Sequence, residues 1–252
     1  MKDFPKTSPD APIVILTGAG ISKESGLATF RGEGGLWQGV SIEQVASPDA
    51  FKENPKLVHS FYNKRKEGLL SKDISPNDAH LALARLERDW LDDVTIITQN
   101  VDNLHERAGS ENLIHMHGEL LKARCVSCDE IFQWQDAMDE GSICPHCAEL
   151  GSMRVDVVWF GEMPLYMAEI EKLLMEGGLF ISIGTSGNVY PAAGFVDMVT
   201  HYNRAKTVEL NIEPSLNADQ FSNGYYGPAT KIVPDFVDKL LGFHFYHILF
   251  RS

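Results

Sequence analysis

The stretch IVILTGAGISKESG, Ile13–Gly26, contains the pattern that decides the fold. Its first four residues are apolar and mostly β-branched, which is typical of a strand buried on both faces. Glycines follow at once, and Gly18 and Gly20 permit a tight turn and a close approach of the backbone to a ligand. The sequence therefore predicts a buried parallel strand that ends in a glycine-rich loop.

Other runs share this apolar character. The predicted strands are Ile13–Leu16, Val94–Thr98, Leu179–Ile183 and Thr207–Leu210, with Lys231–Val233 as a weaker candidate. Apolar residues at helical spacing predict helices over Asn77–Trp90, with Asn77 as its N-cap, and over Met167–Gly177. Strands that alternate with helices predict an α/β fold with a doubly wound parallel sheet.

Two segments do not fit this alternation. Ser41–Pro76 has the pattern of helices and loops, and Gly118–Asp156 contains every cysteine. We expect both to form a smaller lobe over the carboxyl ends of the strands, where ligands bind in such sheets. The predicted organisation is a sheet domain of residues 1–40, 77–117 and 157–252, a helical insertion at 41–76 and a cysteine module at 118–156.

Charge and the two chain ends restrict the class of protein. The 252 residues carry a formal net charge of −13, which opposes broad binding to nucleic acid and fits cationic partners such as lysine-bearing protein tails. Residues 1–12 lack the apolar core of a signal peptide, and the apolar residues 242–252 are too few to span a membrane. We expect a cytoplasmic protein without membrane or direct nucleic-acid contact, and a monomer is compatible with the sequence.

The four cysteines form two close pairs, Cys125-x2-Cys128 and Cys144-x2-Cys147, with fifteen residues between them. This spacing is typical of a tetrahedral zinc site in which four thiolates leave no open position, so a zinc ion there is structural. Disulfides and a redox pair are the alternatives, and the lack of a secretory signal opposes disulfides. His146, inside the second pair, could replace one cysteine.

The segment HSFYNKRKEGLL, His59–Leu70, allows two interpretations. On the first it is a surface helix whose charged residues Lys64, Arg65 and Lys66 lie in water. On the second, Tyr62 and Arg65 lie three positions apart on one helical face, where a phenol and a guanidinium can converge on a carboxylate. The choice depends on what the fold places beside this helix.

Polar residues follow the central strand. Gln99, Asn100 and Asp102 stand where amides and a carboxylate can bind a carboxamide and ribose hydroxyls. His115 and His117 come next, on one face of an extended segment, and they are candidates for a base or for metal ligands. The glycine spacing after the first strand differs from the usual dinucleotide fingerprint, so any dinucleotide site here is a rearranged one.

A series of motifs resembles those of the sirtuins, which are NAD-dependent protein lysine deacylases. In order they are GAGIS, TFRG…GLW, TQNVD, HG before the cysteine pairs, VVWFGE, GTS and LNIE, over about Ile13 to Leu241. The Tyr62/Arg65 pair and the segment GTSGNVYPAAGFV resemble the short bacterial and desuccinylase-like branch. The resemblance implies a Rossmann-like large domain and a small lobe of a zinc module and a helical insertion, with NAD and acyl-lysine bound in the cleft between them.

The resemblance also implies individual roles. His117 is the implied catalytic base, because it immediately precedes Gly118 ahead of the cysteine module. The implied NAD contacts are Gly18, Ala19, Gly20, Ile21, Phe30, Arg31, Trp37, Gln99, Asn100, Asp102, Gly184, Thr185, Ser186, Asn211, Glu213 and Ala229. The implied acyl-lysine contacts are Tyr62, Arg65, Val158, Phe160 and Gly161, the last three on a strand that pairs with the substrate peptide. Cys125, Cys128, Cys144 and Cys147 are the implied zinc ligands.

In the implied chemistry the acyl oxygen displaces nicotinamide from its ribose, His117 accepts a ribose hydroxyl proton, and water releases free lysine and O-acyl-ADP-ribose. The expected substrates are acetyl-lysine and, through Tyr62 and Arg65, succinyl- and malonyl-lysine. Mono-ADP-ribosyl transfer or removal of another acyl group remains open on the same fold. A nicotinamide-dependent oxidoreductase is opposed by the glycine spacing and a closed zinc site. A zinc-ribbon binding module for nucleic acid or protein is a further alternative. The net charge opposes its nucleic-acid form, and the four polar motifs at strand ends are more than a ribbon needs.

Overall fold

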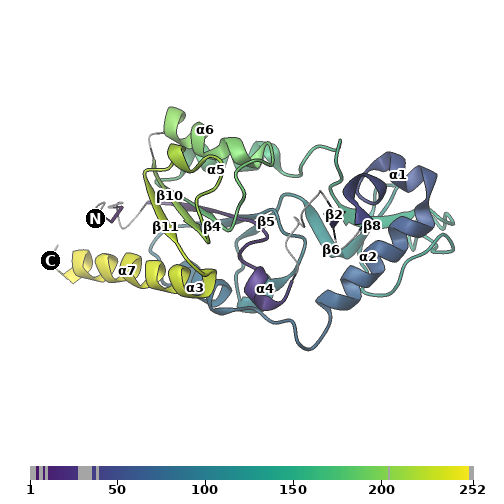
Figure 1. The fold of residues 1–252 in the computed structure, drawn as a ribbon, viewed down its shortest axis with the longest axis horizontal. Helices are drawn as coiled ribbons and strands as arrows, with labels where there is room; N and C mark the ends of the chain where they lie inside the picture. Colours follow the sequence, from purple (N-terminus) through teal and green to yellow (C-terminus); the bar gives the residue numbers. More distant parts are fainter. Residues whose placement is uncertain are drawn as a thin grey trace.

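The computed structural model describes residues 4, 5, 8, 11–27, 36, 37, 40–203 and 205–249. A larger lobe built on a sheet and a smaller lobe lie side by side along the long axis of the molecule (Figure 1). Residues from the N-terminal and C-terminal halves both enter the larger lobe, because the smaller lobe is formed by segments inserted between its strands.

The larger lobe contains a six-stranded sheet in which all neighbouring strands are parallel. Its order is β11-β10-β9-β1-β4-β5, so the glycine-rich loop after β1 lies at the middle of the carboxyl edge. This arrangement confirms the predicted parallel α/β sheet. The strands are β1 (Ile13–Thr17), β4 (Val94–Thr98), β5 (Leu113–His115), β9 (Leu179–Ile183), β10 (Lys206–Asn211) and β11 (Asn223–Tyr226).

Alternate side chains of β1 enter two separate cores. Ile13 and Ile15 pack against the helices α3 and α7, whereas Val14 and Leu16 pack against α5 and α6. Figure 1 shows these two pairs of helices on opposite faces of the sheet. Burial on both faces is the reason that β1 reads as a continuous apolar run. The helices are α3 (Asp78–Asp89), α5 (Met167–Glu176), α6 (Phe195–Tyr202) and α7 (Ala229–Leu249).

The ends of the predicted elements show where local sequence is decisive. Asn77 caps α3, since its side chain accepts a hydrogen bond from the backbone N–H of Ala79 at 3.0 Å. The strand predicted at Lys231–Val233 is wrong, because these residues lie in α7. Phe236 and Leu240 continue their apolar face at helical spacing into the core, and this period outweighs the short β-branched run.

The smaller lobe combines helices with an antiparallel three-stranded sheet of order β7-β6-β8. Two of these helices and one 3-10 helix lie within residues 41–76, where the sequence predicts helices and loops. Phe61 and Tyr62 of α2 share one core with Val155 of β8 and with Trp159 beyond it. The elements are η2 (Ile42–Gln44), α1 (Pro48–Glu53), α2 (Pro55–Leu69), β6 (Gly118–Cys125), β7 (Ile131–Gln133) and β8 (Met153–Val157).

The strand predicted for VVWFGE, Val157–Glu162, is wrong beyond its first residue, because β8 ends at Val157. The backbone N–H of Glu162 donates to the carbonyl oxygen of Trp159 at 3.0 Å, and Gly161 has a φ of +88°. That left-handed conformation suits glycine and belongs to a turn, not to a strand. The motif is therefore a turn at the edge of the smaller lobe.

Short elements complete the chain. The short elements are η1 (Lys23–Ser25), β2 (Leu36–Trp37), β3 (Val40–Ser41), α4 (Leu104–Ala108), η3 (Ala192–Gly194) and η4 (Ala218–Gln220). The apolar C-terminal residues continue α7 as far as Leu249.

Among the described residues, no helix combines the length and the apolar character that crossing a membrane requires.

Candidate active site

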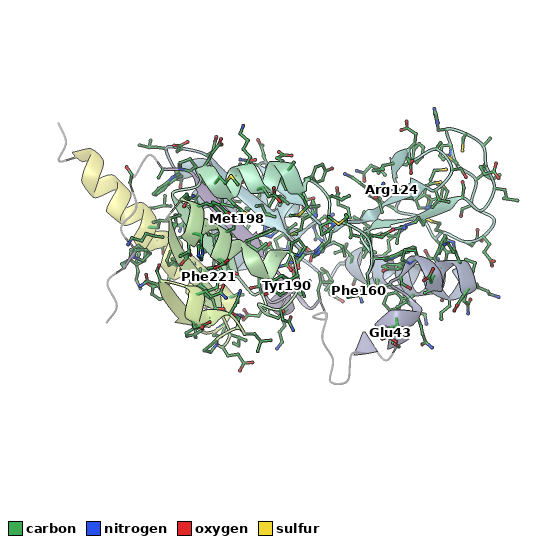
Figure 2. All side chains as sticks on the ribbon, turned by 90° about the horizontal axis from the view of Figure 1, so that it is seen from above. Glu43, Arg124, Phe160, Tyr190, Met198 and Phe221 are labelled. Atoms are coloured by element: carbon green, nitrogen blue, oxygen red, sulfur yellow. The ribbon has the colours of Figure 1, made fainter. Side chains whose placement is uncertain are left out.

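A cavity of about 940 Å³ lies between the two lobes at the carboxyl edge of the large sheet. Loops after β1, β4, β9 and β10 line one side of it, and α2 with the turn after β8 lines the other. Figure 2 shows Phe160 and Tyr190, which come from different lobes, at this junction. The predicted site residues that line the cavity are Gly18, Ala19, Gly20, Tyr62, Arg65, Gln99, Asn100, Asp102, His117, Val158, Phe160, Gly161, Gly184, Thr185, Ser186, Asn211 and Glu213.

The other predicted NAD contacts lie elsewhere. The Ile21 side chain is fully buried in the core beneath the glycine-rich loop, and Ala229 packs against the same core at the start of α7. Trp37 lies in β2, but its side chain is outside what the structure describes, and Phe30 and Arg31 are outside the described residues altogether. The structure thus brings the strand-end residues together and does not place Ile21 or Ala229 in the cavity wall.

The loops after β1 and β9 are in direct backbone contact. The N–H of Gly20 donates to the carbonyl oxygen of Gly184 at 2.9 Å. A Cβ atom on Gly20 would lie 2.7 Å from the Cα of Gly184, and one on Gly184 would lie 2.5 Å from the backbone nitrogen of Ile21. Gly184 also has a φ of +62°, which disfavours other residues. Glycine is required here because the two loops leave room for backbone only.

The Asp102 carboxylate is held at the base of the cavity. Its Oδ1 accepts the backbone N–H of Leu104 at 3.1 Å, and its Oδ2 accepts the hydroxyl of Ser22 at 3.0 Å. Burial raises the pKa of Asp102 above its usual value, and these two hydrogen bonds offset only part of that rise. The amide of Asn100 donates to the carbonyl oxygen of Gly18 at 3.2 Å. These bonds join the loop after β4 to the loop after β1.

His117 lines the cavity with a defined proton position. Its Nδ1 lies 3.0 Å from the carbonyl oxygen of Gln99, which can only accept, so Nδ1 carries the hydrogen. The neutral ring then has its lone pair on Nε2. Burial lowers the pKa of His117, and the bond to Gln99 raises it by less. Gly118 follows with a φ of +76°, and a Cβ there would lie 2.1 Å from the carbonyl oxygen of Asp156.

His115 has a different environment. Its Nδ1 lies 3.2 Å from the carbonyl oxygen of Asn100, and its Nε2 lies 2.9 Å from a carboxylate oxygen of Glu106. Burial lowers the pKa of His115, but the hydrogen bond and charge of Glu106, the charge of Glu119 and the hydrogen bond to Asn100 together outweigh burial, so the pKa is raised. Both nitrogens are thus engaged within the protein. Geometry therefore favours His117 over His115 as the base that faces the cavity.

The loop after β9 is fixed from β10. The side-chain amide of Asn211 donates to the carbonyl oxygen of Thr185 at 2.7 Å. Ser186 donates through its hydroxyl to the side chain of Asn188 at 2.8 Å. Asn211, a predicted ribose contact, therefore uses one of its two amide hydrogens to hold this loop in place. The side chain of Glu213, the other predicted ribose contact, is exposed.

Tyr62 and Arg65 both line the cavity, as the second interpretation of their helix requires. Tyr62 is 3% exposed, and its hydroxyl accepts the indole N–H of Trp159 at 2.9 Å. The guanidinium carbon of Arg65 lies 5.5 Å from the ring centroid of Phe61, and burial lowers the pKa of Arg65 to about 10. Arg65 therefore keeps its charge at neutral pH inside a partly dry pocket.

The neighbouring charges of α2 do not form the solvated face of the first interpretation. Lys66 is 3% exposed, and its ammonium donates to the backbone carbonyl oxygen of Asp136 at 2.8 Å. Asn63 exchanges two hydrogen bonds with the backbone of Met138, at 2.8 and 2.9 Å. Of the three charged residues at 64–66, only Lys64 is exposed. The helix that carries the pair is thus docked on the cysteine module.

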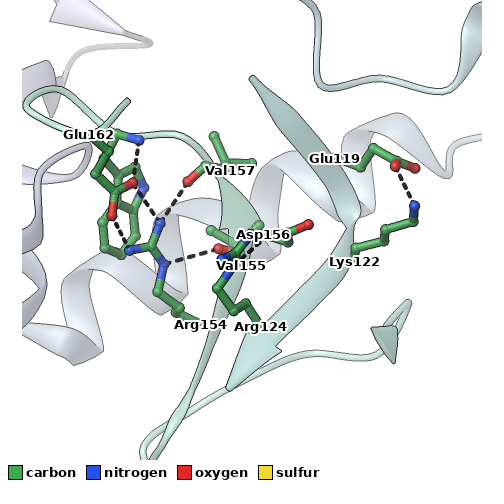
Figure 3. Close-up of polar contacts among 9 residues, drawn as sticks. Glu119, Lys122, Arg124, Arg154, Val155, Asp156, Val157 and Glu162 are labelled. Atoms are coloured by element: carbon green, nitrogen blue, oxygen red, sulfur yellow. Dashed lines mark hydrogen bonds and ion pairs between the residues drawn. The ribbon is translucent and has the colours of Figure 1, made fainter. Parts of the chain in front are cut away.

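Arg154 organises the turn after β8. Its guanidinium forms a two-pronged ion pair with Glu162, at 2.7 and 2.9 Å, and also donates to the carbonyl oxygen of Val157 (Figure 3). The same guanidinium lies 3.5 Å from the ring centroid of Trp159. Glu162 in turn accepts the backbone N–H of Trp159 at 2.8 Å. This network explains the turn that replaces the predicted strand.

The four cysteines come together in the smaller lobe. All four sulfur atoms lie within 4.8 Å of one another, with Cys125 and Cys147 3.7 Å apart and Cys128 and Cys144 3.8 Å apart. Zinc–sulfur bonds of about 2.3 Å in a tetrahedron give sulfur separations of about 3.8 Å, so the cluster suits one zinc ion. His146 is exposed and is not part of the cluster.

Sequence reasoning missed two residues that bear on this site. Ser22 bonds to Asp102, and its position in the motif GAGIS after the glycines was the available signal. Trp159 bonds to Tyr62 from a position 97 residues away, and no local pattern in the sequence indicates that contact. Each of them contacts the site through a hydrogen bond to a predicted residue, Ser22 to Asp102 and Trp159 to Tyr62. These contacts can be recognised only in the folded structure, because they join segments far apart in the sequence.

The model of the Sir2 family matches residues 18–191. The chain belongs to the Sir2 family. It is 55% identical to the NAD-dependent protein deacylase SIR2rp3 of Leishmania major, over 91% of this chain and 95% of that protein. It is likewise 55% identical to the NAD-dependent protein deacylase of Pasteurella multocida, over 91% of this chain and 97% of that protein. The resemblance seen in the motifs is confirmed.

Solved structures of this family have the same fold. A mutant Sir2 homologue in complex with 2′-O-acetyl ADP ribose superposes with a TM-score of 0.83 at 36% identity, covering 92% of this chain and 93% of that one. A Sir2–p53 peptide–NAD+ structure gives a TM-score of 0.75 at 29% identity, covering 90% and 92%. The predicted fold class, a Rossmann-like sheet with a smaller lobe, is confirmed.

Proposed function

We propose that this protein is an NAD-dependent protein-lysine deacylase that also removes acyl groups ending in a carboxylate. One observation carries the proposal: His117, the glycine loops and the Tyr62/Arg65 pair line a single cavity. The names of the relatives, the product complex of one Sir2 homologue and the peptide complex of another support it. We expect acyl-lysine proteins or peptides as substrates and the cytoplasm as the compartment.

The glycine loops suit a dinucleotide. Gly18, Gly20 and Gly184 expose backbone in space that a Cβ atom would fill, which lets a pyrophosphate approach closely. Asp102 and Asn100, held by the bonds described above, would orient the carboxamide and the nicotinamide ribose. When bound, NAD supplies a ribose carbon from which nicotinamide departs as the acyl oxygen attacks.

His117 would accept a proton from a ribose hydroxyl. The bond from its Nδ1 to Gln99 fixes the ring and leaves the Nε2 lone pair for this transfer. Burial keeps the ring neutral by lowering its pKa, so the base is ready at neutral pH. The enclosing lobes would exclude bulk water until the final hydrolysis that releases lysine and O-acyl-ADP-ribose.

The peptide would lie along the turn after β8. The backbone N–H groups of Val158 and Phe160 donate to the carbonyl oxygens of His117 and Ala46, both at 2.9 Å. A peptide strand would therefore pair through other backbone groups of this turn, such as Gly161. The acyl chain would enter the cavity between this turn and α2, toward Tyr62.

Tyr62 and Arg65 give the pocket its preference. A charge-assisted hydrogen bond from Arg65 to a terminal carboxylate would contribute about 1.5–3 kcal/mol, and an acetyl group has no such partner. Burial raises the pKa of Tyr62, so its phenol stays protonated and can donate. This difference favours succinyl-, malonyl- or glutaryl-lysine beside acetyl-lysine.

The test measures nicotinamide release from acetyl-, succinyl-, malonyl- and glutaryl-lysine peptides with NAD. Wild type should release nicotinamide, and Arg65→Met should lose roughly 10- to 100-fold in kcat/KM on succinyl-lysine, and much less on acetyl-lysine. Lys56→Met is the control, because it removes a positive charge from the same helix outside the cavity. Equal losses on both peptides in Arg65→Met would return this arginine to a structural role.

A further inference from the structure

Trp159 is almost fully buried, at 2% exposed, and forms part of the cavity wall behind Tyr62. Its indole N–H is a donor only, and it points at the phenolic oxygen of Tyr62 from 2.9 Å. The Tyr62 hydroxyl is therefore the acceptor in this bond, and its own proton points away from the indole. Accepting one hydrogen bond also makes a hydroxyl a stronger donor in the next.

The indole itself is held on two sides. The guanidinium of Arg154 stacks 3.5 Å from its ring centroid, and the two-pronged pair with Glu162 fixes that guanidinium (Figure 3). Glu162 also accepts the backbone N–H of Trp159. The ring of Phe51 packs on the indole with its centroid 5.4 Å away. An indole constrained in this way aims its N–H in one direction.

We propose that Trp159 is a specificity-determining positioning residue, which sets the direction of the Tyr62 hydroxyl so that it donates to the carboxylate of a dicarboxylic acyl chain. The inference rests on the proposed function and extends it from the pair on α2 to the turn after β8. Arg65 would then bind the carboxylate end of the substrate directly. Trp159 would act on the same carboxylate indirectly, because it orients the Tyr62 hydroxyl that donates to it. Succinyl- and malonyl-type chains depend on this arrangement, while an acetyl chain is too short and lacks the charge.

The first experiment compares Trp159→Phe with wild type on succinyl- and acetyl-lysine peptides. We expect the ratio of succinyl to acetyl kcat/KM to fall about tenfold, mainly through KM for the succinyl peptide, because one oriented donor is lost. A purely structural role predicts parallel losses on both peptides, and that result, or an unchanged ratio, overturns the proposal.

A double-mutant cycle isolates the route through the hydroxyl. Tyr62→Phe removes the phenolic oxygen, so Trp159→Phe added to it should cost no further succinyl preference. Independent, additive losses would mean that Trp159 acts on the substrate by another contact, and they overturn the proposal. If Trp159→Phe does not fold, incorporation of benzothienylalanine at position 159 keeps the bicyclic shape and replaces N–H with sulfur, and it should reproduce the tenfold fall.

Arg154 and Arg124 supply a matched pair of variants, one that contacts Trp159 and one that does not. Arg154→Lys keeps the charge but loses the planar stack and the two-pronged bond, so the succinyl-to-acetyl ratio should fall in the same direction. Arg124 lies opposite Arg154 in the β6–β8 pairing and binds Asp156 at 3.0 Å (Figure 3), so Arg124→Lys should leave the ratio unchanged. Failure of the proposed function is distinguishable, because Arg65→Met would then show no succinyl-specific loss in the same assay.

Discussion

The Nδ1 atom of His117 lies 3.0 Å from the carbonyl oxygen of Gln99. Because burial lowers the pKa of His117, the neutral base should persist below the ordinary histidine value of 6.5. The base is lost only as pH falls through this lowered pKa. The acid limb of a kcat/KM profile against pH should therefore have its midpoint below 6.5, measured as nicotinamide release with saturating NAD.

His117→Ala removes the base and should lower kcat by about 10²- to 10⁴-fold, the range typical of general acid–base catalysis. Circular dichroism should show an intact fold, since the side chain is only part of the cavity wall. The His115→Gln variant separates the two histidines: it should retain the low acid limb of the wild type. Near wild-type turnover in His117→Ala would mean that another group is the base.

Gly184→Ala tests the backbone contact between the two glycine loops. Its Cβ would lie 2.5 Å from the backbone nitrogen of Ile21 in a left-handed conformation, so we expect a loss of at least about 2 kcal/mol in unfolding free energy and a raised KM for NAD. Urea titration and initial rates measure both. Gly242→Ala is the control, because a Cβ in that helical position meets nothing within 4 Å. An unchanged KM for NAD would argue against a dinucleotide at this loop.

The sequence predicted secondary structure most accurately where the burial of a short segment alone determines its residues. β1, β4 and β9 are buried along their whole length, so composition alone predicted them. β11 (Asn223–Tyr226) was not predicted, because this edge strand alternates burial and contains a glycine and an asparagine. Its place beside β10 is decided by tertiary pairing, which no local pattern encodes.

The same distinction applies to the site. Strand-end residues such as Gly20 and Asp102 were predictable, because parallel strands bring their carboxyl ends to one edge. Trp159 was not, because its role depends on α2 and the turn after β8 meeting across the smaller lobe. The turn itself was expected to be a strand because the motif VVWFGE resembles the strand with which sirtuins pair a substrate peptide, and the sequence does not reveal that Arg154 holds Glu162.

The zinc site gives a prediction independent of activity. Metal analysis of purified protein should find one zinc per chain, and Cys128→Ser should lower both the zinc content and the melting temperature. A strong chelator should unfold the smaller lobe first, because β6, β7 and β8 surround the cluster while the large sheet has its own cores. The control is His146→Ala, which should keep its zinc. Protein free of zinc with an unchanged melting temperature would exclude the four-thiolate site.

His80 predicts how stability depends on pH. It is fully buried at the start of α3, where its Nδ1 accepts the backbone N–H of Asn77 at 3.3 Å, and burial lowers its pKa to about 4. Between pH 6.5 and 4 the unfolded chain binds a proton on this histidine and the folded chain does not. The free energy of unfolding should therefore be fully retained above pH 6.5 and fall by on the order of 3 kcal/mol as pH drops to 4.

The measurement is urea unfolding at a series of pH values. His80→Gln removes this titration, so its stability should fall less steeply across the same window, although it starts from a lower value because the cap of α3 is weakened. His201→Gln is the matched control, since His201 is exposed and pairs with Asp197 at the surface. Parallel pH dependences for wild type and His80→Gln would show that this histidine is already charged in the folded protein, and the lowered pKa would be wrong.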